Sequence, residues 1–287
     1  MPVPRIADNF PWALTMNLPI PNRISLPILL SLVMLMSGCA SLPNEKVGAI
    51  NHQLVEYALV RHETGTGTVV FENGLDGKMG WWKKVLPEIA KDTTTFAYNR
   101  PGYGKSDPIE TPRDGLHTVD ELRLLLGSIG LQPPYVLVGH SLGGLYMQLF
   151  ARRYPGEVSA LILVDSTHPA QFKGKGSVEN WPAWFRLAFR LYLSAAATAE
   201  MDAINTTGEE VLALPTLTGK PVIVLSALQP MQEKSELADD ANEKRKDIAR
   251  LYPGSKQVWV DSGHGIPLES PESVITAIQE VLPRQQP

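Results

Sequence analysis

Short apolar runs recur along the chain between residues 54 and 260, with amphipathic stretches between them. Some of these runs are apolar at every position, as at 136–138 and 161–164. A strand of this kind needs cover on both faces, which is the situation of strands in a parallel sheet. The pattern therefore predicts strands at 54–60, 68–71, 94–98, 135–138, 160–164, 221–225 and 257–260.

Amphipathic segments between these runs predict helices at 81–90, 119–129, 142–153, 236–251 and 271–281. Strands that alternate with helices indicate a doubly wound α/β sheet. The alternation stops at 166–219, where helical segments follow one another with no strand between them. We interpret 51–165 and 220–287 as the α/β core, and 166–219 as a helical cap inserted over the C-terminal edge of the sheet.

The stretch 181–192 of this cap carries aromatic residues at helical spacing, with Arg186 and Arg190 one turn apart. Three interpretations remain open. The helix could pack on the sheet domain, line an apolar substrate pocket, or rest on a lipid surface.

The N-terminal region combines a basic residue, a short apolar stretch at 24–36 and a group of small residues that includes Cys39. This order is typical of a secretory signal, and the stretch is shorter than the roughly 20 residues that a membrane-spanning helix needs. The residues before Cys39 resemble the bacterial lipobox, whose cysteine is lipidated. We predict a signal peptide over 1–38, with Met16 as an alternative start, and a tether over 39–50.

A signal of ordinary type, with Cys39 buried in the mature domain, is the alternative. The prediction places the protein in the cell envelope, in the outer membrane or periplasm if the source is Gram-negative. Because Cys39 is the single cysteine, an intramolecular disulfide and a cysteine-based metal cluster are excluded. The net charge of −4, without a long run of Lys or Arg, makes nucleic acid an improbable partner.

A Gly-x-Ser-x-Gly sequence occurs at 139–143, between a predicted strand and a predicted helix. A tight strand-to-helix turn strains the backbone of Ser141 and needs small neighbours such as Gly139 and Gly143. The turn exposes the serine hydroxyl, and the helix N-terminus directs backbone N–H groups at developing negative charge. In this context the motif predicts a nucleophilic serine.

With this motif, the sequence from about residue 52 to residue 282 resembles the α/β-hydrolases. By that resemblance, the loop 71–75 supplies the N–H of Leu75 to an oxyanion hole, together with the N–H of Leu142. The resemblance also implies that His264, in the loop after the last strand, is the general base. The turn 99–106 also matches a family motif, which we interpret as structural.

More than one residue could be the acid that orients His264. The family usually takes it from the loop after the strand 221–225, and no Asp stands there at the expected place. Asp165, at the end of the preceding strand, is the first candidate. Glu233 is the second, with Asp239 or Asp240 behind it.

These residues predict a serine hydrolase that cleaves carboxylic esters through an acyl-enzyme, with no metal or cofactor, acting on a small-molecule ester or related acyl compound. Amide, thioester or C–C hydrolysis and perhydrolysis could use the same three side chains. The alternative of another class is a catalytically silent envelope lipoprotein that uses the fold for binding.

Overall fold

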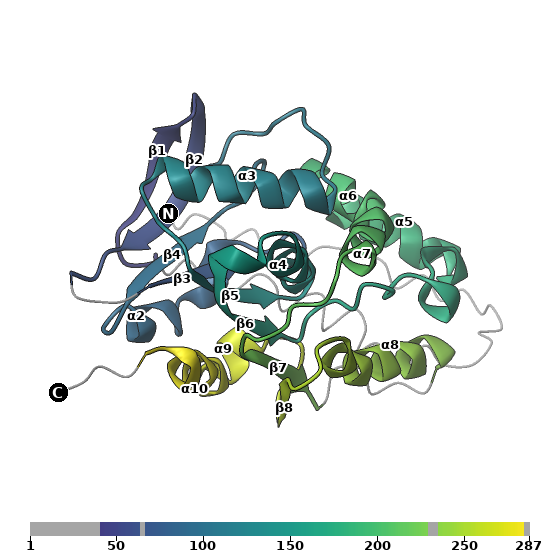
Figure 1. The fold of residues 1–287 in the computed structure, drawn as a ribbon. Helices are drawn as coiled ribbons and strands as arrows, with labels where there is room; N and C mark the ends of the chain where they lie inside the picture. Colours follow the sequence, from purple (N-terminus) through teal and green to yellow (C-terminus); the bar gives the residue numbers. More distant parts are fainter. Residues whose placement is uncertain (1–40, 64–66, 229–234, 284–287) are drawn as a thin grey trace, which may run out of the picture.

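The computed structural model describes residues 41–63, 67–228 and 235–283, so Cys39 and the predicted signal peptide lie outside the described residues. Within these ranges, eight strands form one sheet (Figure 1). They are β1 (Glu45–Ile50), β2 (Gln53–Val60), β3 (Thr68–Glu72), β4 (Thr94–Tyr98), β5 (Tyr135–His140), β6 (Val158–Val164), β7 (Val222–Ala227) and β8 (Lys256–Val260).

The strand order is β1-β2-β4-β3-β5-β6-β7-β8. The pairs β1–β2 and β2–β4 are antiparallel, and all other neighbours are parallel. The predicted doubly wound, mostly parallel sheet is thus confirmed. The predicted tether 39–50 was wrong in its second half, because β1 pairs with β2 along its whole length, from Glu45 opposite Ala58 to Ile50 opposite Gln53.

The side chains of the continuous apolar runs belong to two hydrophobic cores, one on each face of the sheet. In β3, Val70 faces one core, while Val69 and Phe71 face the other. The first core lies under α3 (Gly115–Ser128), α4 (Leu142–Arg153) and α7 (Ile204–Ala213) (Figure 1). The second lies against α2 (Leu86–Ile89) and α10 (Pro271–Val281).

Two predicted helices are divided into shorter pieces. The prediction 81–90 corresponds to η2 (Met79–Trp82) and α2, and Pro87 at the start of α2 lacks the N–H that a continuous helix would need. The prediction 236–251 corresponds to α8 (Glu236–Asp247) followed by η6 (Ile248–Leu251). The core is completed by η3 (Pro155–Glu157) and α9 (Ile266–Glu269). None of the described helices is long and apolar enough to cross a bilayer.

Residues 166–219 form no strand and contain η4 (Gly174–Gly176), η5 (Val178–Asn180), α5 (Ala183–Tyr192), α6 (Ala195–Asp202) and α7. No residue of α5 is fully buried, so the structure does not bear out the interpretation of α5 as a helix packed tightly on the sheet domain. Its Phe185 and Phe189 rings pack on Trp181, whereas Trp184 and Leu191 are exposed. The cap is held to the core by the buried residues of α6 and α7.

Candidate active site

Ser141 occupies the sharp turn between β5 and α4. Its backbone has φ 53° and ψ −124°, a left-handed region that side-chain-bearing residues rarely adopt. The turn is possible because its neighbours are glycines: a Cβ on Gly139 would lie 2.5 Å from the carbonyl oxygen of Gly143. The N–H of Ser141 donates to the carbonyl of Val164 at 3.1 Å, which ties the turn to the end of β6. The strained geometry predicted for the motif is therefore present.

The loop after β3 lies directly against this serine. A Cβ added to Gly74 would stand 3.1 Å from the Cβ and 3.6 Å from the Oγ of Ser141, so a side chain at this position would crowd the serine. Leu75 follows in the same loop, and Leu142 is the first residue of α4, where backbone N–H groups have no acceptor within the helix. The two predicted oxyanion donors thus stand on the two backbone segments that flank Ser141.

His264 lies in the loop between β8 and α9, and its side chain is 45% exposed. Its Nδ1 is 2.6 Å from Oδ2 of Asp165. The loop is held by Glu269, whose Oε2 accepts hydrogen bonds from the N–H of Gly263 at 2.7 Å and from the hydroxyl of Ser262 at 3.0 Å. The imidazole is therefore oriented by a carboxylate at one nitrogen, which leaves Nε2 for other partners.

Asp165 is buried at the end of β6, and four donors reach its carboxylate. Besides His264, these are the N–H of Ala227, at 3.1 Å from Oδ1, and two nitrogens of Arg245: Nε at 2.6 Å from Oδ1 and an Nη at 3.1 Å from Oδ2. Burial alone would raise the pKa of Asp165. The hydrogen bond from His264 and the charge of Arg245 outweigh that effect, so this pKa lies well below its usual range.

His140 lies beside the site without the contacts of a base. Its ring stacks on Trp81 at 4.9 Å, and its Nε2 is 2.9 Å from the carbonyl oxygen of His264. Since a carbonyl only accepts, Nε2 carries the hydrogen. Burial and the neighbouring His264 lower the pKa of His140 to about 3, so it is neutral at physiological pH and supports the His264 loop.

Of the other candidate acids, only Asp239 and Asp240 are among the described residues, and neither is paired with His264 there. Glu233 lies outside the described residues. Asp240 pairs with Lys244 at 2.6 Å on α8, the helix that also carries Asp239. The remaining histidine considered for the pocket, His168, is buried and accepts a hydrogen bond from the N–H of Ala170. Among the described residues no cluster of His, Cys, Asp or Glu is arranged to hold a metal ion.

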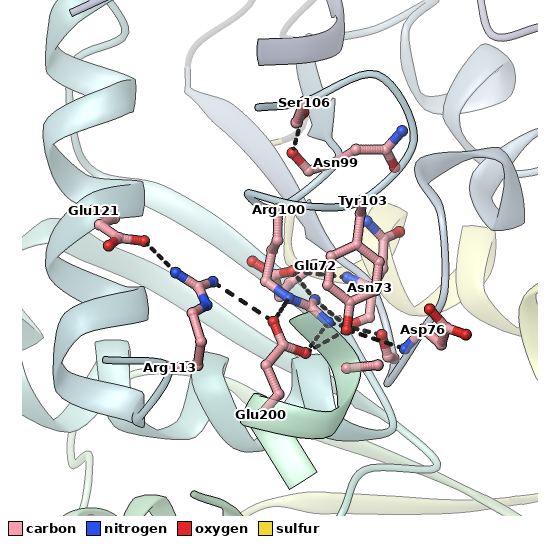
Figure 2. A network of polar contacts seen from close by, with 12 residues as sticks. Glu72, Asn73, Asp76, Asn99, Arg100, Tyr103, Ser106, Arg113, Glu121 and Glu200 are labelled. Atoms are coloured by element: carbon pink, nitrogen blue, oxygen red, sulfur yellow. Dashed lines mark hydrogen bonds and ion pairs between the residues drawn. The ribbon is translucent and has the colours of Figure 1, made fainter. Parts of the chain in front are cut away.

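Sequence reasoning missed a buried charged network beneath the loop after β3 (Figure 2). Its centre is the side chain of Arg100, which is 1% exposed and lies between the carboxylates of Glu72 and Glu200, both fully buried. The guanidinium also donates to the backbone carbonyls of Asn73 and Gly74. The turn 99–106, interpreted as structural, thus places a cation next to the loop that carries Leu75.

Further side chains extend this network to the cap and to α3. The hydroxyl of Tyr103 donates to Glu200 at 2.6 Å and accepts from the N–H of Asp76 at 3.2 Å. Arg113 bonds Glu121 at 2.8 Å and lies 3.5 Å from Glu200. Burial raises the pKa of Glu72, although the charge of Arg100 opposes this shift.

Comparison with known proteins agrees with this topology. A family model described as "alpha/beta hydrolase fold" matches residues 67–201. Over 107 residues the chain is 32% identical to the uncharacterized protein YqjL of Bacillus subtilis, covering 37% of this chain and 42% of that protein. Over 123 residues it is 28% identical to the human (lyso)-N-acylphosphatidylethanolamine lipase, covering 41% and 36% respectively. The chain therefore spans less than half the length of these curated relatives.

Among solved structures, a thermophilic esterase from Thermogutta terrifontis is similar with a TM-score of 0.58 at 24% sequence identity, over 82% of this chain and 97% of that one. Likeness at this level of identity speaks for the fold. Together with the strand order and the turn at Ser141, it shows that the chain has the α/β-hydrolase fold.

Proposed function

We propose that this protein is a serine hydrolase that cleaves carboxylic esters through an acyl-enzyme on Ser141. The observation that carries the proposal is the contact of 2.6 Å between His264 Nδ1 and the buried carboxylate of Asp165, at the same sheet edge as the strained serine. Parallel strands bring their carboxyl ends together, which is where ligands bind in sheets of this kind. The nucleophile, the base and the acid follow β5, β8 and β6.

In the proposed mechanism, Nε2 of His264 removes the hydroxyl proton as Ser141 attacks the ester carbonyl. Asp165 holds the ring and stabilises the imidazolium that forms. The N–H groups of Leu75 and Leu142 stabilise the oxyanion, each by roughly 3 kcal/mol. His264 then protonates the alcohol, and water repeats the sequence on the acyl-enzyme.

The test is an assay of the chain from Ala40 onward on short and long p-nitrophenyl esters, beside Ser141→Ala. Turnover by the wild type that Ser141→Ala abolishes is the expected result. A fluorophosphonate probe should label the wild type and not the variant. A folded wild type that is neither labelled nor active on any ester would contradict the proposal and favour the silent binding lipoprotein.

The choice of oxygen esters as the substrate class rests on the names of similar proteins alone, since these include a lipase and an esterase. A wild type that is labelled but inactive on oxygen esters would move the proposal to amide, thioester or C–C substrates, or to perhydrolysis with added peroxide. Parallel assays on matched p-nitroanilide and thioester substrates of one acyl group separate these reactions.

We also propose that the chain is exported and lipid-anchored through Cys39, on the sequence pattern alone. Expression of the full chain in a bacterium with an alkyne-labelled fatty acid should label the wild type but not Cys39→Ser. Equal absence of label in both would leave an ordinary cleaved signal as the remaining interpretation.

A further inference from the structure

The guanidinium of Arg100 uses all five of its N–H donors. Nε donates to Glu200 at 2.7 Å, and one Nη donates to Glu72 at 2.6 Å and to the carbonyl of Asn73 at 2.7 Å. The other Nη donates to Glu200 at 2.8 Å and to the carbonyl of Gly74 at 2.9 Å. An arginine with five satisfied donors in a buried site has one permitted orientation.

The carbonyl of Gly74 and the N–H of Leu75 belong to the same peptide unit. That unit is planar and trans, so its oxygen and its hydrogen point in opposite directions. Whatever holds the carbonyl of Gly74 therefore also aims the N–H of Leu75. Two groups hold it: the Arg100 guanidinium at 2.9 Å and the N–H of Gly77 at 3.2 Å. The positive charge of the guanidinium next to the carbonyl oxygen also polarises the peptide and strengthens its N–H as a donor.

The position of Arg100 depends in turn on the cap. Glu200 lies on α6, is fully buried, and accepts two hydrogen bonds from Arg100 and one from Tyr103. Figure 2 shows this carboxylate rising from the cap helix to the guanidinium, with the loop of Asn73 on the other side. The path from the cap to the oxyanion loop is thus two side chains long and has no exposed member.

We infer that Arg100 and Glu200 are positioning residues for catalysis: Glu200 of the cap holds Arg100, and Arg100 orients the Gly74–Leu75 peptide toward the oxyanion. The inference rests on the proposed serine hydrolase function. It assigns the cap a part in transition-state stabilisation, besides any part in substrate binding. Because the oxyanion forms only in the transition state, loosening this path should lower kcat and leave KM nearly unchanged.

The test compares Glu200→Gln with Asp202→Asn, an exposed carboxylate on the same helix whose partner is Arg190. Glutamine keeps the size of the side chain but has no charge and replaces one acceptor oxygen with an NH₂ group, so the two-oxygen contact with Arg100 is lost. The substrate is p-nitrophenyl butyrate, and the extent of fluorophosphonate labelling counts the competent sites. We expect Glu200→Gln to lower kcat per labelled site by roughly 10- to 100-fold with KM within about threefold, and Asp202→Asn to match the wild type.

Counting sites separates positioning from folding. A purely structural role would reduce the number of labelled sites and leave kcat per site at the wild-type value, which would overturn the inference while leaving the proposed function standing. If Glu200→Gln does not fold, Glu200→Asp keeps the charge but shortens the reach, and it should still lower kcat per site severalfold. Wild-type kcat per site in Glu200→Asp would then overturn the inference. A wild type without ester turnover or labelling would instead contradict the proposed function itself.

Discussion

On one side of Ser141, the loop after β3 is held by charged side chains that have no contact with solvent, with Arg100 at their centre. On the other side, His264 is 45% exposed; Asp165 orients its ring, and Glu269 and His140 hold its loop. The first arrangement fixes a backbone peptide, whereas the second orients one ring by a single short contact.

The difference matches what the proposed function requires of the two sides. An oxyanion hole works by preorganisation, because its dipoles must already point at the developing charge. A general base must exchange a proton with the nucleophile, the leaving group and water, so its ring needs access. Burial therefore suits the loop of Leu75, and partial exposure suits His264. If this division is right, the largest loss of activity should come from a substitution beside His264, and the largest loss of stability from one beneath the loop of Leu75.

The largest effect on activity should come from Asp165→Asn on the base side. Asparagine can donate to Nδ1 of His264, which would place the imidazole hydrogen on Nε2 and block proton abstraction. We expect kcat for p-nitrophenyl butyrate to fall by roughly 10³- to 10⁴-fold, with the fold retained by circular dichroism. The control is Asp240→Asn, which loses an ion pair with Lys244 and should keep its activity. Near-normal kcat in folded Asp165→Asn would move the role to Glu233.

The largest effect on stability should come from the oxyanion side. Arg100→Met leaves the carboxylates of Glu72 and Glu200 buried without their shared cation, at a cost of about 3–5 kcal/mol in the free energy of unfolding. Lys105 of the same turn is paired with Glu56 but 72% exposed, so Lys105→Met should cost less than about 1 kcal/mol. Urea unfolding measures both. Similar losses of unfolding free energy in the two variants would mean that the buried Arg100 contributes no more to stability than an exposed lysine of the same turn.

Much of the fold could be predicted from local patterns. Runs that are apolar at every position predicted the parallel strands, because both faces of the sheet are covered. The strand β1 was missed, because residues 45–50 are exposed or half-buried and lack such a run. The pairing with β2 that makes them a strand cannot be seen in the segment itself.

The candidate site could likewise be predicted only in part. The strained turn at Ser141 and the place of Asp165 beside His264 could be predicted, because the turn is a local motif and Asp165 ends a strand beside it. Arg100, Glu200 and Arg245 could not, because each acts through a partner 80 or 100 residues away. The only local signal was Arg100 itself, a charged residue within a turn motif directly after a buried strand.

The partner of Asp165 offers a smaller test on the base side. Because the pKa of Asp165 is lowered on folding, its carboxylate stabilises the fold above its unfolded pKa of about 3.9, and this contribution is lost as the pH falls toward the folded value. Arg245→Gln removes one cause of that lowering. The variant should therefore acid-unfold at a higher pH than the wild type, and lose roughly tenfold in kcat/KM.

The control for this change is Arg250→Gln, which removes an 80% exposed charge paired with Asp247. Its acid unfolding, followed by tryptophan fluorescence, should coincide with that of the wild type. Identical midpoints for Arg245→Gln and the wild type would show that His264 and Ala227 suffice to keep the carboxylate ionised.

The smallest effect should come from Glu269→Gln, which tests how the His264 loop itself is held. The substitution keeps an oxygen for the N–H of Gly263, at 2.7 Å in the wild type, but removes the charge that strengthens this bond. Because Glu269 is itself exposed, we expect only a roughly two- to fivefold fall in kcat and almost no change in the free energy of unfolding. A fall as large as that of Asp165→Asn would mean that the loop, and not the carboxylate of Asp165, places the imidazole, and the base side would then be as rigidly determined as the oxyanion side.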